Sequence, residues 1–183
     1  MSGIAQVRQD FEFVDYLIGN GMKKDAIQYT NRFDTLIPTL PQAQQDSLFF
    51  LKGWAYYSSK KLTEAADYFL QMTDSLSPLK PKATYFASLC LAQSGQYATA
   101  DSLLSTLNDT TEVFAFEKAG IALLNRNLDE YTRQAQHFSF ADYRLSSAQQ
   151  ELQHAYTDIA SLKPKKKWIA GAASALVPGL GKI

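Results

Sequence analysis

The residues of this chain that could do chemistry are few, and their spacing builds no familiar active site. The segment Gly179-Leu-Gly181-Lys182 invites a phosphate-binding loop. Such a loop needs a glycine where Leu176 stands and a serine or threonine where Ile183 stands. No predicted helix follows to offer its N-terminus to a phosphate. The sequence therefore argues against nucleotide binding, and we expect no cofactor.

The histidines and the cysteine do not form a metal site. His137 and His154 are the only histidines, and no His-x-x-x-His or Glu-x-x-His pattern surrounds them. We interpret His137 as a packing residue and His154 as a solvated one. Cys90 is the only cysteine, so an intramolecular disulfide and a cysteine zinc site are excluded. Its leucine neighbours favour a buried small side chain over a reactive thiol.

Acid–base or nucleophilic catalysis has equally little support. The adjacent carboxylates Asp129-Glu130 fit the start of a helix, where the dipole favours acidic side chains. A serine–histidine–aspartate triad is a spatial arrangement that sequence does not reveal, but no Gly-x-Ser-x-Gly elbow is present. We therefore expect a protein that is not an enzyme, with no catalytic, cofactor-binding or metal-binding residues.

Aromatic side chains offer a different chemistry, that of binding another polypeptide. Tyr56 and Tyr57 are adjacent on a predicted helix, so their side chains diverge by about 100° and face different surroundings. Tyr56 fits a packing position. Tyr57 is then a candidate anchor for a partner in an exposed groove. The alternative, in which Tyr57 packs between neighbouring helices, has equal support.

Composition and charge describe a globular body followed by a basic tail. The chain has 183 residues with 46% hydrophobic and 20% charged content, which is typical of a folded domain. Residues 163–183 hold five lysines and no acidic residue, which leaves 13 basic and 18 acidic residues in 1–162. A net acidic body argues against a nucleic-acid partner, because binding phosphates needs a basic surface.

The elements that must position these residues are helices. Apolar residues recur at intervals of three and four, whereas sustained alternation and flanked hairpin turns typical of strands are absent. Short polar turns at Asn20-Gly21, 58–60, Ser94-Gly95 and 125–127 divide the helices into antiparallel pairs. The predicted pairs are 6–19 with 22–36, 43–59 with 62–76, 82–94 with 97–107, and 112–125 with 128–137.

Two of these pairs share one spacing of small and large residues. The first carries it at Gly53, Tyr56, Ala65 and Phe69, and the second at Ser88, Leu91, Ala100 and Leu104, thirty-five residues later. A period near 34 is typical of a helical-repeat solenoid. The spacing resembles the tetratricopeptide repeat (TPR) family, whose small residue lets two helices approach closely.

The resemblance implies an all-α fold, a right-handed α-solenoid of about four helix-turn-helix hairpins with a C-terminal capping helix. It covers about residues 8–137, and the outer hairpins keep less of the pattern, as end repeats commonly do. After them, apolar residues from Leu145 to Leu162 form one stripe. This stripe predicts a helix within about 139–162 that caps the last hairpin, with a coiled-coil dimer seam as the alternative. We expect one repeat domain over 1–162.

The tail has the order of side chains found at membrane surfaces. Lys165, Lys166, Lys167 and Trp168 precede a small apolar run, and lysine and tryptophan favour headgroups and the interfacial region. The uncharged stretch from Trp168 to Gly181 is shorter than the roughly 20 residues that a spanning helix needs. The tail resembles bacterial TPR proteins in which a Ser-Ala-x-x-Pro-Gly-x-Gly motif, here Ser174 to Gly181, leads into a membrane-embedded region. The alternative is a disordered basic tail.

These patterns together predict a non-enzymatic TPR scaffold that binds a protein or peptide partner and associates with a membrane through its C-terminal region. A soluble TPR adaptor with a flexible end is the alternative, and neither form takes a small-molecule substrate. Met1–Asp10 lacks the features of a signal peptide. As written, the protein is then cytoplasmic, and lysines that flank a first spanning segment also favour the cytoplasmic side; removal of a leader would make it periplasmic.

Overall fold

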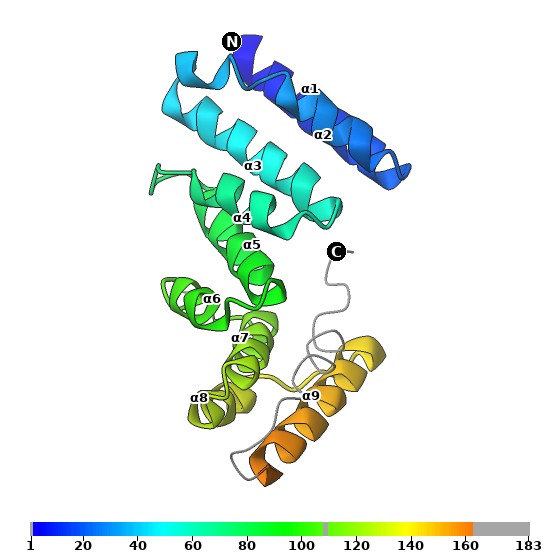
Figure 1. The fold of residues 1–183 in the computed structure, drawn as a ribbon, viewed down its shortest axis with the longest axis vertical. Helices are drawn as coiled ribbons and strands as arrows, with labels where there is room; N and C mark the ends of the chain where they lie inside the picture. The colour runs from blue at the N-terminus through cyan, green and yellow to red at the C-terminus, as the bar shows by residue number, and fades with distance from the viewer. Residues whose placement is uncertain (1, 108–109, 163–183) are drawn as a thin grey trace. The chain divides into compact units, whose positions relative to one another are not determined.

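The computed structural model describes residues 2–107 and 110–162, and these residues form nine α-helices and two short 3₁₀ helices with no strand (Figure 1). The predicted all-α class is therefore confirmed. The chain divides into two compact units, Met1–Ser94 (unit 1) and Gly95–Ile183 (unit 2). The division falls inside the predicted third hairpin, between its two helices.

Unit 1 holds five α-helices, each packed against its neighbours in the chain. Helix α1 lies against α2 and α3, α3 against α4, and α4 against α5. The bounds are α1 Ser2–Gly19, α2 Lys23–Asn31, η1 Ile37–Thr39, α3 Gln42–Ser58, α4 Leu62–Leu70 and α5 Lys80–Gln93.

Unit 2 holds the other four α-helices. Helix α7 packs against α6, α8 and α9, so it is the central helix of this unit. The bounds are α6 Tyr97–Leu104, α7 Glu112–Leu124, α8 Leu128–Gln134, η2 Ala135–His137 and α9 Tyr143–Ser161.

The turns of three hairpins share one backbone conformation and one hydrogen-bond pattern. Gly21, Lys60 and Arg126 adopt positive φ angles of 76°, 61° and 58°. The next amide in each case bonds back to a carbonyl five residues earlier, Met22 to Leu17 at 2.8 Å, Lys61 to Tyr56 at 3.0 Å and Asn127 to Ala122 at 2.8 Å. This left-handed cap ends the first helix and reverses the chain. The predicted turns at Asn20-Gly21, 58–60 and 125–127 are thereby confirmed.

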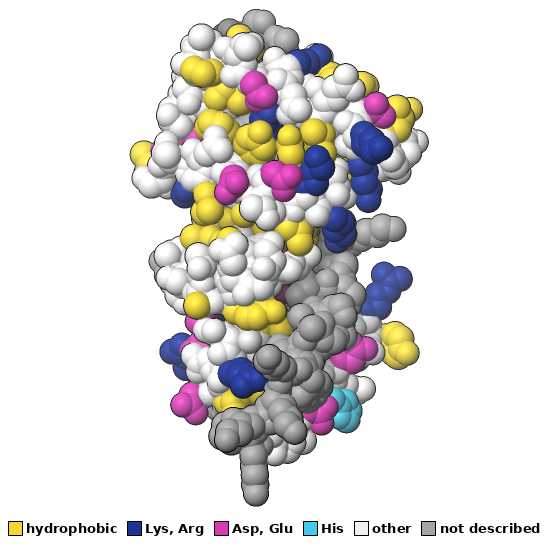
Figure 2. Space-filling view, viewed as in Figure 1, with side chains coloured by type: hydrophobic (Ala, Val, Ile, Leu, Met, Phe, Trp, Pro, Cys, Tyr) yellow, Lys and Arg dark blue, Asp and Glu magenta, His cyan; other side chains and the backbone are white. Residues whose placement is uncertain are grey.

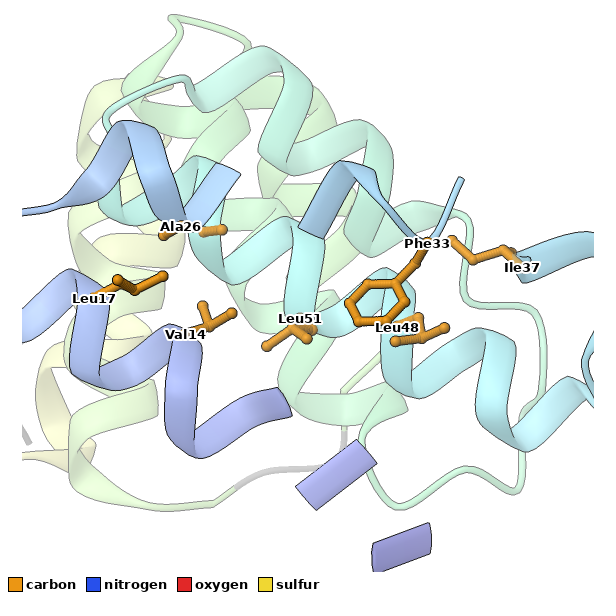
Figure 3. Close-up of a cluster of buried hydrophobic side chains, with 8 residues drawn as sticks. Val14, Leu17, Ala26, Phe33, Ile37, Leu48 and Leu51 are labelled. Atoms are coloured by element: carbon orange, nitrogen blue, oxygen red, sulfur yellow. The ribbon is translucent and has the colours of Figure 1, made fainter. Parts of the chain in front are cut away.

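One core cluster of unit 1 lies where α1, α2 and α3 meet. Its buried side chains are Val14, Leu17, Ala26, Phe33, Ile37, Leu48, Leu51 and Ala55 (Figure 3). Val14 and Leu17 are three apart on α1 and so point to one face of that helix. Phe33 and Ile37 follow α2 and extend the same core to η1.

Helix α9 covers the last hairpin. Leu152 is 1% exposed and belongs to a cluster with residues of α7 and α8, among them Phe116, Ala119 and Tyr131. Ala148, Ala155, Tyr156 and Ile159 pack around it from the same face of α9. The apolar stripe is therefore used within the chain, as predicted for a capping helix.

Four predicted helices end at least three residues earlier in the structure, and hydrogen bonds from a side chain explain one of these early ends. The helix predicted over 62–76 ends at Leu70. The Asp74 side chain accepts a hydrogen bond from the Leu76 amide at 2.9 Å, and the Asp74 amide donates to the buried Asp46 carboxylate at 3.2 Å. Such local bonds give the backbone an alternative to the helix. The helices predicted over 22–36, 97–107 and 128–137 end at Asn31, Leu104 and Gln134. The 3₁₀ helix η2 follows α8 directly, whereas turn residues 32–36 separate α2 from η1.

Candidate functional site

The predicted packing positions of the second hairpin meet in the structure. A Cβ atom added to Gly53 on α3 would lie 2.6 Å from the ring of Phe69 on α4, inside any normal contact distance. Ala65 and Phe69 are both buried. The aromatic ring thus occupies the space that a side chain at position 53 would need. A small residue against a large one is what lets α3 and α4 approach closely.

The structure decides between the two interpretations of Tyr57 and bears out the one in which this side chain packs between neighbouring helices. Tyr57 is only 8% exposed and packs against Trp54 and Phe86, with ring centroids 6.0 and 5.3 Å away. The interpretation of Tyr57 as an exposed anchor is wrong, because α5 supplies Phe86 to cover it. Tyr56 is partly exposed and lies against Tyr68, 5.1 Å between centroids.

The corresponding residues of the third predicted hairpin are buried, but they lie in different units. Ser88 and Leu91 belong to α5 in unit 1, whereas Ala100 and Leu104 belong to α6 in unit 2. The Ser88 hydroxyl donates to the Tyr85 carbonyl at 2.7 Å, which satisfies it inside the core. Cys90 is fully buried, and burial raises the pKa of its thiol to about 12, so it is inert as predicted.

A buried lysine that sequence reasoning missed ties the first two hairpins of unit 1 together. Lys52 on α3 is fully buried, yet its Nζ donates to Asp34 Oδ1 at 2.5 Å and to Asn31 Oδ1 at 3.0 Å. The ammonium also lies 4.7 Å from the Tyr68 ring. All three partners compensate its desolvation, so this network is structural.

Unit 2 carries a pocket of about 280 Å³ beside the central helix α7, and we define it as the α7–α8 pocket. Lys118 of α7 and Arg133 of α8 contribute cationic side chains, and Phe114 contributes an apolar wall. The complete lining is Leu107, Thr110, Phe114, Ala115, Lys118, Arg133, Gln134 and His137. Five of these side chains can donate hydrogen bonds, and the lining contains no carboxylate.

Two carboxyl groups near the α7–α8 pocket, those of Glu130 and Asp101, have shifted pKa values. Glu130 accepts from Arg133 and, at 2.7 Å, from Gln134. Burial acts to raise the pKa of Glu130, but the hydrogen bonds from Gln134 and Arg133, together with the positive charges of Arg133 and Lys118, lower it overall. The pKa of Asp101 is raised, first by burial and then by the negative charge of Glu130. Glu130 thus stays ionised beside Arg133, whose guanidinium keeps further donors for a ligand.

The histidines are both at the surface. His154 is exposed on α9, as predicted. His137 is also exposed and lines the α7–α8 pocket, so its interpretation as a core packing residue is wrong. Throughout residues 2–107 and 110–162, no group of three or more histidine, cysteine, aspartate or glutamate side chains is placed to hold a metal ion.

The predicted membrane-surface residues Lys165, Lys166, Lys167 and Trp168 lie outside the described residues, as does the motif from Ser174 to Gly181. Within the described part of the chain, no helix combines the length and the apolar character that crossing a membrane requires.

Comparison with known proteins adds no relative. No protein-family model matches the chain, and no curated protein and no solved structure matches it. The described residues define an all-helical protein in which helices pack against their neighbours in the chain within each unit.

Proposed function

We propose that this protein is a non-enzymatic TPR-like scaffold whose α7–α8 pocket binds an acidic segment of a protein or peptide partner. The observation that carries the proposal is that two basic side chains, Lys118 and Arg133, line this one pocket. Residues 95–162 contain only four basic residues against nine acidic ones. Two of those four, Lys118 and Arg133, line the same pocket.

The pocket chemistry favours a carboxylate carried on an apolar neighbour. Lys118 and Arg133 offer charge-assisted hydrogen bonds, which are stronger than neutral ones. Phe114, Leu107 and Ala115 offer apolar contact to the rest of the same ligand. The surrounding acidic surface disfavours anions elsewhere on unit 2, so electrostatics would select the position at which the partner binds.

Binding to a synthetic peptide array tests the partner proposal. We expect the full chain to retain peptides in which aspartate or glutamate adjoins a large apolar residue. The charge reversals Lys118→Glu and Arg133→Glu should each weaken the best peptide at least about tenfold, as measured by fluorescence anisotropy, because they place like charges together. Arg144→Glu on α9 changes the same charge in the same unit outside the pocket and should leave affinity unchanged. Equal losses from Arg144→Glu would assign the effect to net charge and refute the pocket.

We further propose that residues 163–183 attach this scaffold to anionic membranes. Lysines near a lipid surface contribute about 1 kcal/mol each, and Trp168 favours the interface. The acidic body gives no attraction of its own. The soluble adaptor remains the second candidate, because peptide binding at the α7–α8 pocket does not depend on the tail.

Co-sedimentation with vesicles distinguishes these two forms. We expect the full chain to sediment with phosphatidylserine-containing vesicles at low salt and to dissociate as salt shortens the Debye length from about 30 Å at 0.01 M to about 8 Å at 0.15 M. Replacing Lys165, Lys166 and Lys167 together with glutamate should abolish sedimentation, while circular dichroism stays unchanged. If the triple variant sediments like the parent, the tail is not the attachment site and the adaptor form is favoured.

A further inference from the structure

Two donors that line the α7–α8 pocket are already bonded to a carboxylate of the protein. Glu130 of α8 accepts hydrogen bonds from Arg133 and, at 2.7 Å, from Gln134, and both donors line the pocket. The Glu130 side chain is only 12% exposed, whereas that of Arg133 is 68% exposed. The guanidinium is thus accessible to a ligand although it is paired with Glu130.

The charge of Glu130 persists beside the pocket. Glu130 lies in the first turn of α8, where the helix dipole favours a negative charge, and its amide donates to the Asn127 side chain at 3.1 Å. The hydrogen bonds from Gln134 and Arg133 lower its pKa. Glu130 therefore stays ionised at neutral and mildly acidic pH.

A second carboxylate belongs to the same group of charges. Asp101 lies on α6, which packs against α7. The charged groups that act on Asp101 are Lys118 of α7 and both Glu130 and Arg133 of α8. Burial and the negative charge of Glu130 raise the pKa of Asp101, whereas that of Glu130 is lowered. Asp101 is therefore the first of these two carboxylates to take up a proton as the pH falls.

An anion that enters the pocket must compete with these two carboxylates. It is attracted by Lys118 and Arg133 and repelled by Glu130 and Asp101, and each contribution falls with distance. Figure 2 shows both acidic and basic side chains on the exposed surface of unit 2. The added negative charge of a ligand would raise the pKa of Asp101 further, so binding and proton uptake favour each other.

We propose that Glu130 and Asp101 compete with the partner's acidic group for the cations of the α7–α8 pocket and thereby couple its binding to proton uptake. This inference rests on the proposed function of the pocket and adds its regulation. Affinity should increase as the pH falls through the raised pKa of Asp101 in the complex and level off below the pKa of Asp101 in the free protein. The scaffold would hold an acidic partner more tightly in a mildly acidic environment.

Removing the internal competitor should improve binding. The probe is a rhodamine-labelled peptide in which cysteic acid adjoins phenylalanine, because its sulfonate keeps one charge at every pH used. Glu130→Gln preserves the size of the side chain and removes its charge. We expect this variant of the full chain to bind the probe at least about threefold more tightly at neutral pH, as measured by fluorescence anisotropy. Asp101→Asn should also tighten binding.

Asp129→Asn is the matched control. Asp129 is exposed in the same first turn of α8, so the substitution removes the same charge from the neighbouring residue. It should leave the Kd unchanged within a factor of about two, because solvent and salt screen an exposed charge. A gain of affinity in Glu130→Gln also shows that the variant is folded. An equal gain in Asp129→Asn would assign the effect to net charge and overturn the proposal.

The pH dependence tests the coupling to protons. These measurements use a His137→Gln background, because protonation of an imidazole in the pocket lining would add a second source of pH dependence. The Kd in this background should fall as the pH is lowered from about 7.5 to about 5. Adding Asp101→Asn should give tight binding already at neutral pH and remove most of this dependence.

The remaining outcomes separate this inference from the proposed function. Unchanged or weaker binding in Glu130→Gln overturns the competition, and the same pH dependence with and without Asp101→Asn overturns the coupling to protons. Peptide binding at the pocket stands in both cases. A probe that binds neither the parent nor Glu130→Gln at any pH overturns the inference and the proposed function together.

Discussion

Replacing Leu152 with alanine is expected to destabilise unit 2 by about 2–5 kcal/mol, the largest effect that we predict. Leu152 is 1% exposed and is surrounded by side chains of α7 and α8, so truncation leaves a cavity under α9. The neighbours have little freedom to refill it, because Tyr131 and Tyr156 are stacked 4.4 Å apart and the Tyr131 hydroxyl donates to Gln153 at 2.9 Å. Amide hydrogen exchange of α7, α8 and α9 measures this loss without interference from unit 1.

A second leucine on α9 provides the control. Leu162, at the C-cap, is 42% exposed, and Leu162→Ala should change stability by less than about 0.5 kcal/mol. The coiled-coil alternative predicts a different outcome, in which Leu152→Ala leaves protection within one chain unchanged and alters only self-association. That outcome would contradict the capping role of α9.

Replacing Gly53 with alanine is expected to cost about 1–3 kcal/mol in unit 1, although alanine is normally the better residue inside a helix. The added methyl group would lie 2.6 Å from two atoms of the Phe69 ring. That ring is stacked on Phe86 at 5.6 Å and meets Phe50 at 5.5 Å, so it has no free space into which to move. Urea unfolding followed by Trp54 fluorescence, in a Trp168→Phe background, reports the change for unit 1.

Gly120 offers a matched comparison in the interior of α7, where an added Cβ meets nothing within 4 Å. Gly120→Ala should stabilise the protein by about 0.5–1 kcal/mol, since only the backbone entropy changes. Adding Phe69→Leu to Gly53→Ala should cost less than the sum of the two single changes, because the shortened side chain makes room for the methyl group. If Gly53→Ala proved as harmless as Gly120→Ala, the close contact between α3 and α4 would be wrong.

The sequence by itself determined the features that depend on residues close together in the chain. Helical periodicity, the left-handed turn at Gly21 and the small-against-large spacing of Gly53 and Phe69 each arise within one helix or one hairpin. The apolar stripe of α9 is a further example, because residues three and four apart face one side of a helix; what that stripe packs against was decided only by the structure. The acidic body and basic tail also follow from composition alone.

Only the tertiary structure decided which surfaces these helices cover. The sequence fixes the side of α3 on which Tyr57 lies. Whether its side chain is exposed to solvent depends on Phe86, which lies twenty-nine positions later in the chain. The α7–α8 pocket likewise depends on how α8 and η2 turn against α7. The contacts of Asp10 with Tyr29 and Arg32 likewise join α1 to residues about twenty positions later.

The division between the two kinds of feature has a physical cause. Turn and helix preferences are local free energies, set by the backbone and by side chains within about four residues. Burial, by contrast, depends on many weak contacts between segments that are far apart in the chain. The sequence around a residue does not specify which distant segment will cover its side chain. The helices and turns of this protein could therefore be predicted from its residues, whereas its pocket and the burial of Tyr57 could be identified only from the packing of the helices.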